Sequence, residues 1–305
     1  MAKDSNDTDH RPIRRILRRM IKAPAVWSLL WPMLLLIGSY VAYSRWFAPR
    51  MVAQYGTLDP AAVTLSPAHE YVRTDLVSEV YRDTRLSELS PLDRRVTEKL
   101  ASAFVSNPWV KHVRSVRKLP GGKIEIDVDY RRPVAVFHLT GDKEWLQTID
   151  DYLASIGAAI QGGADNAYFP LDGDGVLLPT EKMTSEDTRN LIHIEVSRVF
   201  PTGTKGTPFG DRRVESAALL AKLLDAVRDN VRVAKIVVSG DPRFNLVPEL
   251  ELTLGDGTQL FWGSPPGMEQ PNERDARAKL ADLLSGNYVS GSNLKISQQR
   301  LAPIR

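Results

Sequence analysis

Residues 123–133 are Lys-Ile-Glu-Ile-Asp-Val-Asp-Tyr-Arg-Arg-Pro, and they form the most regular pattern in the chain. Apolar and polar side chains alternate strictly, which predicts a strand with one face against a core. A proline cannot donate a ladder hydrogen bond, so the segment that begins at Pro133 is expected to continue as an edge or as the next strand. One face of the predicted strand carries four apolar side chains: Ile124, Ile126, Val128 and Tyr130.

The segments before this strand predict the rest of a small domain. Residues 109–118 form a second candidate strand with irregular alternation, and Leu-Pro-Gly-Gly at 119–122 is a turn sequence between the two. Further upstream, 70–82 and 92–104 carry apolar residues at helical spacing, and 61–66 is a candidate first strand. The predicted order is therefore strand, helix, helix, strand, strand.

This region resembles the polypeptide-transport-associated (POTRA) domain of the bacterial FtsQ/DivIB division proteins. That family shows Pro-Trp-Val after the second helix, a turn that contains proline, and a charged pair before Pro-Val-Ala. Residues 108–110, 119–120 and 131–135 match these features. The resemblance implies a short cytoplasmic tail, one membrane span, a POTRA domain and a second, β-rich domain, in that order.

An uncharged run of 22 residues precedes this region, from Ala23 to Ser44. Crossing the hydrocarbon core of a bilayer takes about 20 apolar residues of helix, so the run predicts a transmembrane helix. It is longer than the apolar core of a secretory signal, and its end fits a cleavage site poorly. Basic residues beside a span stay in the cytoplasm, so residues 45–305 are expected across the membrane.

Positive charge is concentrated before that run. Residues 1–22 hold seven Lys or Arg and three Asp, whereas the remainder holds 33 basic and 34 acidic residues. Because the remainder has almost no net charge, it is not expected to contain a nucleic-acid-binding domain. At helical spacing the basic residues share one face, which is typical of a segment that binds anionic lipid. The alternative is that these charges only fix the topology of the span. The candidate lipid-facing residues are Arg14, Arg15, Arg18, Arg19 and Lys22.

The C-terminal part is expected to form a second domain around a mixed sheet. Asp-Gly-Asp-Gly at 172–175 is a tight turn rather than a calcium loop, because the later acidic ligands of such a loop are missing. The remaining predicted elements are strands at 191–196 and 231–239, a hairpin at 250–262, and helices at 212–230 and 272–284.

The predicted fold class is therefore α+β. A single transmembrane helix is followed by a POTRA-like β-α-α-β-β domain and by a second domain with a mixed α/β sheet. The predicted divisions are a cytoplasmic basic tail (1–22), a transmembrane helix (23–44), a linker (45–59), a POTRA-like domain (60–138) and an FtsQ-type β domain (139–305).

The sequence contains no motif that predicts catalysis. It has no Cys, which excludes disulfides, cysteine-ligated zinc and thiol catalysis. Its five histidines lack metal-binding spacing, and Ser-Gly-Ser at 290–292 lacks the strand–turn–helix context of a hydrolase elbow. We therefore predict a protein that is not an enzyme and has no cofactor, no metal, no nucleic-acid partner and no small-molecule substrate.

The resemblance implies a scaffold of the division machinery in the inner membrane at the septum, with partners of the FtsB and FtsL type. An exposed sheet edge can accept a partner's strand by main-chain pairing, and the last predicted strand, 294–300, is the candidate edge. It is alternatively an interior strand. The family ends this strand with an Ile-Asp-Leu-Arg type sequence, whereas residues 294–297 are Leu-Lys-Ile-Ser. The candidate partner-binding residues are Tyr288, Leu294, Lys295, Ile296, Ser297, Gln298 and Arg300.

Two other functions belong to different classes. One is a POTRA-type chaperone or transport component that holds extended polypeptides at the envelope, although the chain has only one POTRA-like unit. The other is a membrane-tethered sensor for a small ligand, for which no polar residues converge in the sequence. A septal band of a fluorescent fusion favours the division scaffold, and a uniform envelope signal favours the others.

Overall fold

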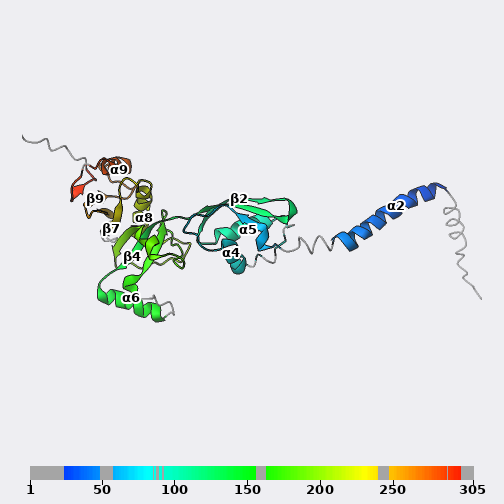
Figure 1. Ribbon diagram of the computed structural model, residues 1–305, viewed down its shortest axis with the longest axis horizontal. Coiled ribbons are helices and arrows are strands. Elements are labelled where there is room, and N and C mark those ends of the chain that lie inside the picture. Colours follow the sequence, from blue (N-terminus) through cyan, green and yellow to red (C-terminus); the bar gives the residue numbers. More distant parts are fainter. Residues whose placement is uncertain are drawn as a thin grey trace, which may run out of the picture. The chain divides into compact units, whose positions relative to one another are not determined.

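The fold is α+β and contains two mixed sheets, as predicted for its class (Figure 1). Contacts divide the chain into two units, one formed by Met1–Asp59 with Ser87–Val96 and the other by Pro60–Leu86 with Thr97–Arg305. Both sheets belong to the second unit. The computed structural model describes residues 24–48, 58–84, 86, 89–90, 93–155, 163–239, 247–286 and 288–296.

Helix α2 (Pro24–Ala42) occupies most of the uncharged N-terminal run, and a π-helical turn follows at Tyr43–Phe47. Within the part of the chain that the structure describes, no helix has the length and apolar character that crossing a bilayer takes. The prediction of a transmembrane helix at 23–44 is therefore wrong. Helix α2 has 19 residues, and proline, serine, glycine and aromatic residues interrupt its aliphatic ones.

The smaller sheet contains β1 (Val63–Leu65), β2 (Val110–Lys118) and β3 (Ile124–Tyr130), with β3 in the centre. Strand β3 pairs parallel with β1 and antiparallel with β2. Helices α4 (Leu76–Thr84) and α5 (Val96–Val105) lie between β1 and β2 in the sequence. The predicted order of strand, helix, helix, strand, strand is confirmed.

Seven strands form the larger sheet: β4 (Pro133–Thr140), β5 (Tyr168–Asp172), β6 (Ile192–Ser197), β7 (Val233–Ser239), β8 (Glu249–Leu254), β9 (Gln259–Gly263) and β10 (Ser292–Asn293). Their order is β10-β9-β8-β7-β6-β4-β5. The pairs β10–β9, β7–β6 and β6–β4 are parallel, and the other pairs are antiparallel. Strand β4 belongs to this sheet, although the range 60–138 predicted for the POTRA-like domain includes most of it. The hairpin predicted at 250–262 is confirmed as β8 and β9.

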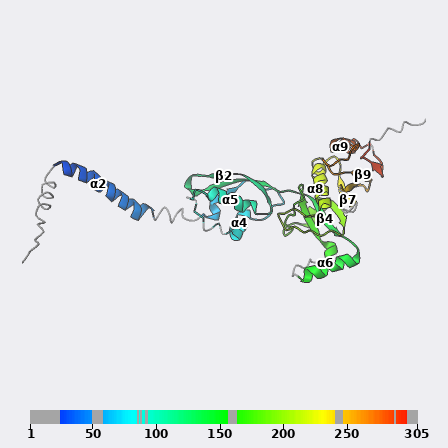
Figure 2. The ribbon, with the colours of Figure 1, turned by 180° about the vertical axis from the view of Figure 1, so that it is seen from behind.

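Helix α8 (Arg212–Asp225) packs against β4, β6 and β7 and supplies much of the core (Figure 2). Asp211 fixes its start, because the Asp211 carboxylate accepts the Arg213 N–H at 2.8 Å. Alanines on the buried face let the helix approach the sheet closely. The buried apolar residues of α8 are Val214, Ala217, Ala218, Leu220, Ala221 and Leu224.

Helix α6 (Lys143–Ser155) was not predicted. The Asp142 carboxylate accepts the Trp145 N–H at 2.9 Å, Leu146 and Ile149 pack against the core, and Leu153 is buried. The sequence therefore contained a helix cap and apolar residues at helical spacing. The other helices of the described segments are α7 (Ser185–Arg189) and α9 (Ala276–Ser285), and single 3-10 turns occur at Pro60–Ala62, Pro120–Gly122 and Ala164–Asn166.

Asp172, at the end of β5, links the two sheets. One of its carboxylate oxygens accepts the N–H groups of Asp174 and Val176, each at 2.9 Å, and confirms the tight turn predicted at 172–175. The other oxygen lies 2.6 Å from Nη1 of Arg131, the residue that follows β3. Both side chains are largely removed from water, with exposed fractions of 5% and 16%. This buried ion pair therefore holds the last strand of the small sheet to the edge of the large one.

Apolar contacts and a second ion pair reinforce the same junction. Tyr71, Leu76 and Trp109 from the small-sheet region form one buried cluster with Leu178 from the loop after β5. The Arg73 guanidinium also binds the Asp187 carboxylate through two hydrogen bonds of 2.8 Å each. Trp109 and Arg131 belong to the segments that carry the POTRA resemblance, so these segments include residues that join the two sheets.

We predict that Asp172→Ala lowers the free energy of unfolding by about 3–5 kcal/mol, because it leaves the Arg131 charge buried without its partner. Urea unfolding measures this loss. Asp229→Ala is the matched control, because Asp229 is exposed, and it should change stability by less than about 0.5 kcal/mol. A loss at Asp172 no larger than that of the control would contradict the role of the ion pair.

Candidate docking site

Strand β10 is the last strand at one edge of the seven-stranded sheet. It pairs with β9 through Ser292 opposite Leu260 and Asn293 opposite Phe261. The Gly291 and Leu294 N–H groups extend this pairing, donating to the carbonyls of Gln259 at 2.7 Å and Phe261 at 2.9 Å. The C-terminal segment therefore covers β9 and forms the edge itself.

Successive residues of β10 differ in the direction of their side chains and of their main-chain groups. Ser292 and Leu294 are buried, whereas Asn293 between them is exposed. Successive residues of a strand direct their main-chain groups to alternate sides. Because Leu294 uses its N–H for β9, the N–H of Asn293 points away from β9, toward the open edge.

Large apolar side chains are exposed around this edge. Val289 and Ile296, which flank β10, are 74% and 58% exposed, and Phe261 on β9 is 46% exposed. Leu284 near the end of α9 is exposed as well. A main-chain edge with exposed apolar residues beside it has the two features that strand addition uses: hydrogen bonds for affinity and side-chain contacts for specificity.

A buried charged network holds the chain behind this edge. The Glu273 carboxylate lies 2.6 Å from Lys279 Nζ, and both side chains are almost fully buried. Glu273 also accepts the Ser264 N–H at 2.8 Å, the Ser264 hydroxyl at 2.6 Å and the Gln270 N–H at 3.0 Å. The Lys279 ammonium is 5.3 Å from the centre of the Trp262 ring on β9. Helix α9, the loop before it and β9 are thereby tied together.

The hydrogen bonds determine the charge state of this network. Burial alone raises the pKa of Glu273, but the hydrogen bonds from Lys279, Ser264 and Gln270 outweigh burial and hold the pKa at about 2. The terminal segment is fastened to the same region, because the Arg274 N–H donates to the Lys295 carbonyl at 3.1 Å and Lys295 Nζ lies 2.9 Å from Glu249.

Two of the other three described sheet edges are less suited to strand addition. The loop after β5 folds back over its outer side, where Leu178 N–H donates to the Pro170 carbonyl at 2.9 Å. Strand β2 is an edge of the small sheet, but it carries Lys111, Arg114 and Arg117. Charged side chains on an edge strand oppose pairing with another chain.

The structure places four of the seven predicted partner-binding residues near this edge. Ile296 is exposed, Lys295 and Tyr288 are partly buried, and Leu294 belongs to the core. Asn293 and Phe261, which have the more exposed positions on β10 and β9, were not predicted. The remaining candidates lie outside the described residues: Ser297, Gln298 and Arg300, and the basic residues Arg14, Arg15, Arg18, Arg19 and Lys22.

Comparison with known proteins does not assign the chain to a family. No family model matches it, and no curated protein matches it either. The FtsQ/DivIB resemblance of residues 107–135 therefore stays a prediction. Within the described ranges there is also no group of three or more His, Cys, Asp or Glu residues that could hold a metal ion.

We predict that Glu273→Gln destabilises the protein in a pH-dependent way. The folded-state pKa of Glu273 is about 2, below the ordinary value of 4.5, so the stabilisation by its carboxylate is present above pH 4.5 and is lost as the pH falls toward 2. The difference between wild type and Glu273→Gln should be about 3–5 kcal/mol at neutral pH and should shrink on acidification.

Urea unfolding between pH 7 and pH 3 measures this difference. Glu144→Gln, at an exposed position of α6, is the control and should show a small difference at every pH. A difference for Glu273→Gln that stays constant over this range would contradict the assignment of the buried charge.

Proposed function

We propose that this chain is a non-catalytic docking protein that accepts an extended segment of a partner as an additional strand beside β10. The observation that carries the proposal is the edge at Asn293, beside which the described residues place no further strand, with Val289, Ile296 and Phe261 exposed around it. Main-chain pairing recognises an extended conformation, and the apolar residues select a partner with apolar side chains at alternate positions. The buried Glu273–Lys279 pair keeps this edge in place before binding.

The partner class follows from the resemblance to FtsQ/DivIB. Under this proposal the chain acts in bacterial cell division at the septum, its partners are small proteins of the FtsB and FtsL type, and the POTRA-like region aids recruitment. The observed order β1, α4, α5, β2, β3 supports the POTRA assignment. A septal band of a fluorescent fusion agrees with this function, whereas a uniform envelope signal favours a POTRA-type polypeptide-binding chaperone.

We predict that Asn293→Pro abolishes capture of the partner. Proline lacks the N–H that points to the open edge, yet proline is tolerated on edge strands where that N–H faces away from the sheet. Co-purification with FtsB- and FtsL-type proteins measures the effect, and an unchanged urea midpoint shows that the variant still folds.

Asn293→Ala is the matched control. It removes the same side chain, including the oxygen that accepts the Lys295 N–H at 2.9 Å, but keeps the main-chain donor of residue 293. It should therefore retain most of the capture. Equal capture by the proline and alanine variants would contradict strand addition at β10.

A further inference from the structure

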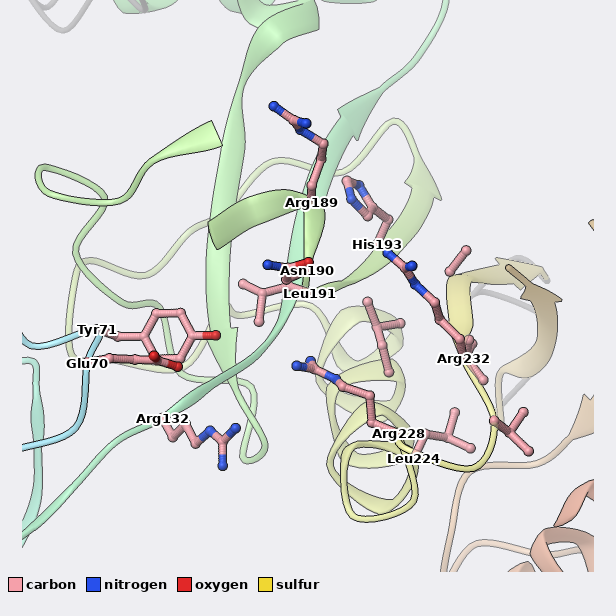
Figure 3. Close-up of a pocket in the computed structure, with 14 residues that line it drawn as sticks. Glu70, Tyr71, Arg132, Arg189, Asn190, Leu191, His193, Leu224, Arg228 and Arg232 are labelled. Atoms are coloured by element: carbon pink, nitrogen blue, oxygen red, sulfur yellow. The ribbon is translucent and has the colours of Figure 1, made fainter. Parts of the chain in front are cut away.

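A second site lies where β6 and β7 begin and where α8 ends. It is a cavity of about 440 Å³ that the chain forms from widely separated segments (Figure 3). Its charged lining consists of four arginines, Arg132, Arg189, Arg228 and Arg232, and one carboxylate, Glu70. All of these residues belong to the second unit of the chain, and the docking edge at β10 contributes none of them.

The positive charge of this cavity is only partly compensated. Arg228 Nη2 lies 3.0 Å from the Asp225 carboxylate but makes no hydrogen bond within the described residues. The other three guanidinium groups have no carboxylate partner in the described part of the chain. With Asp225 and Glu70 counted against four arginines, the cavity keeps an excess of two positive charges.

The arginines are placed to act together. In Figure 3, Arg132 and Arg228 extend toward one another from opposite sides of the cavity, and the Tyr71 ring lies to one side of the space between them. Arg232 extends toward His193. Burial lowers the pKa of His193, and the nearby His138 and Lys235 lower it as well, while Glu195 and a hydrogen bond with the main chain of Thr188 act in the opposite direction. Its ring is therefore neutral at pH 7 and adds no charge.

We propose that this cavity binds a small phosphate monoester. A phosphate monoester carries about −1.5 to −2 charges at pH 7, which matches the excess of positive charge. Guanidinium groups bind phosphate oxygens through paired hydrogen bonds, and arginines on opposite sides can hold one phosphoryl group between them.

The size of the cavity and its uncharged lining residues indicate the organic part of the ligand. A cavity of about 440 Å³ is much larger than a single phosphate needs, since a water molecule in the liquid occupies about 30 Å³. Tyr71, Leu191 and Leu224 supply an apolar wall beside the arginines. The organic part of the monoester lies against this wall, so an ester with an apolar group should bind more tightly than inorganic phosphate.

Isothermal titration calorimetry of the whole chain with phenyl phosphate, inorganic phosphate and phenol tests the proposal. We expect phenyl phosphate to bind more tightly than inorganic phosphate, and phenol to show no binding. Arg132→Gln/Arg232→Gln should weaken phenyl phosphate binding by about tenfold or more, because it removes two of the charged donors. Both arginines are exposed and have no carboxylate partner among the described residues, so this variant should keep the wild-type urea midpoint.

Arg277→Gln/Lys143→Gln is the matched control, because it removes two exposed positive charges outside the cavity. It should leave phenyl phosphate binding unchanged. Absence of phenyl phosphate binding to the wild type, or equal weakening in the two double variants, would overturn the proposal. Inorganic phosphate binding as tightly as phenyl phosphate would overturn the assignment of the apolar wall.

Discussion

The buried ion pair between Arg131 and Asp172 joins the two sheets where the chain passes from one to the other. Asp172 meets three donors at once: the Arg131 guanidinium and the N–H groups of Asp174 and Val176. A carboxylate satisfied in this way can stay charged in a largely dry position. The pair therefore orients the end of β3 against the end of β5, and the chain passes from one sheet to the other between Tyr130 and Pro133.

The far edge of the large sheet is built on the same physical principle. Lys279 is buried because Glu273 lies beside it and Trp262 lies under its ammonium group. Such pairs contribute little net stability compared with apolar residues, but they are costly to break, and they restrict the arrangement of the segments that carry them. Here they keep α9 and the preceding loop against β9, which leaves the short strand β10 at the open edge.

The parts of the fold that depend on local patterns could be predicted from the sequence. Strict alternation of apolar and polar residues predicts β3, and a Gly-Asp-Gly turn predicts the β8–β9 hairpin. Asp211, followed by apolar residues at helical spacing, predicts α8. The helix predicted at 70–82 begins only at Leu76, because Asp75 caps it and the preceding residues enter the junction instead. The transmembrane helix was inferred from the length of an uncharged run beside basic residues, but no described helix is both long and apolar enough to cross a bilayer.

The sites depend on contacts between distant segments, which a local pattern does not contain. The sequence suggested the last strand as a docking edge but centred it on residues 294–300, whereas the described strand is Ser292–Asn293 and its exposed neighbour Phe261 comes from β9. The arginine-lined cavity combines Arg132 with Arg189, Arg228 and Arg232, which are far apart in the chain. No spacing rule connects them, so a small-ligand site could not be predicted without the fold.

Strand addition places the proposed partner beside the edge at β10. Hydrogen–deuterium exchange of the main-chain amides, measured with and without an FtsB- or FtsL-type partner, detects this pairing directly. We expect the amides of residues 288–296 to exchange more slowly in the complex, and those of β2 to be unchanged. Slower exchange confined to β2 or to other parts of the chain, with residues 288–296 unaffected, would contradict it.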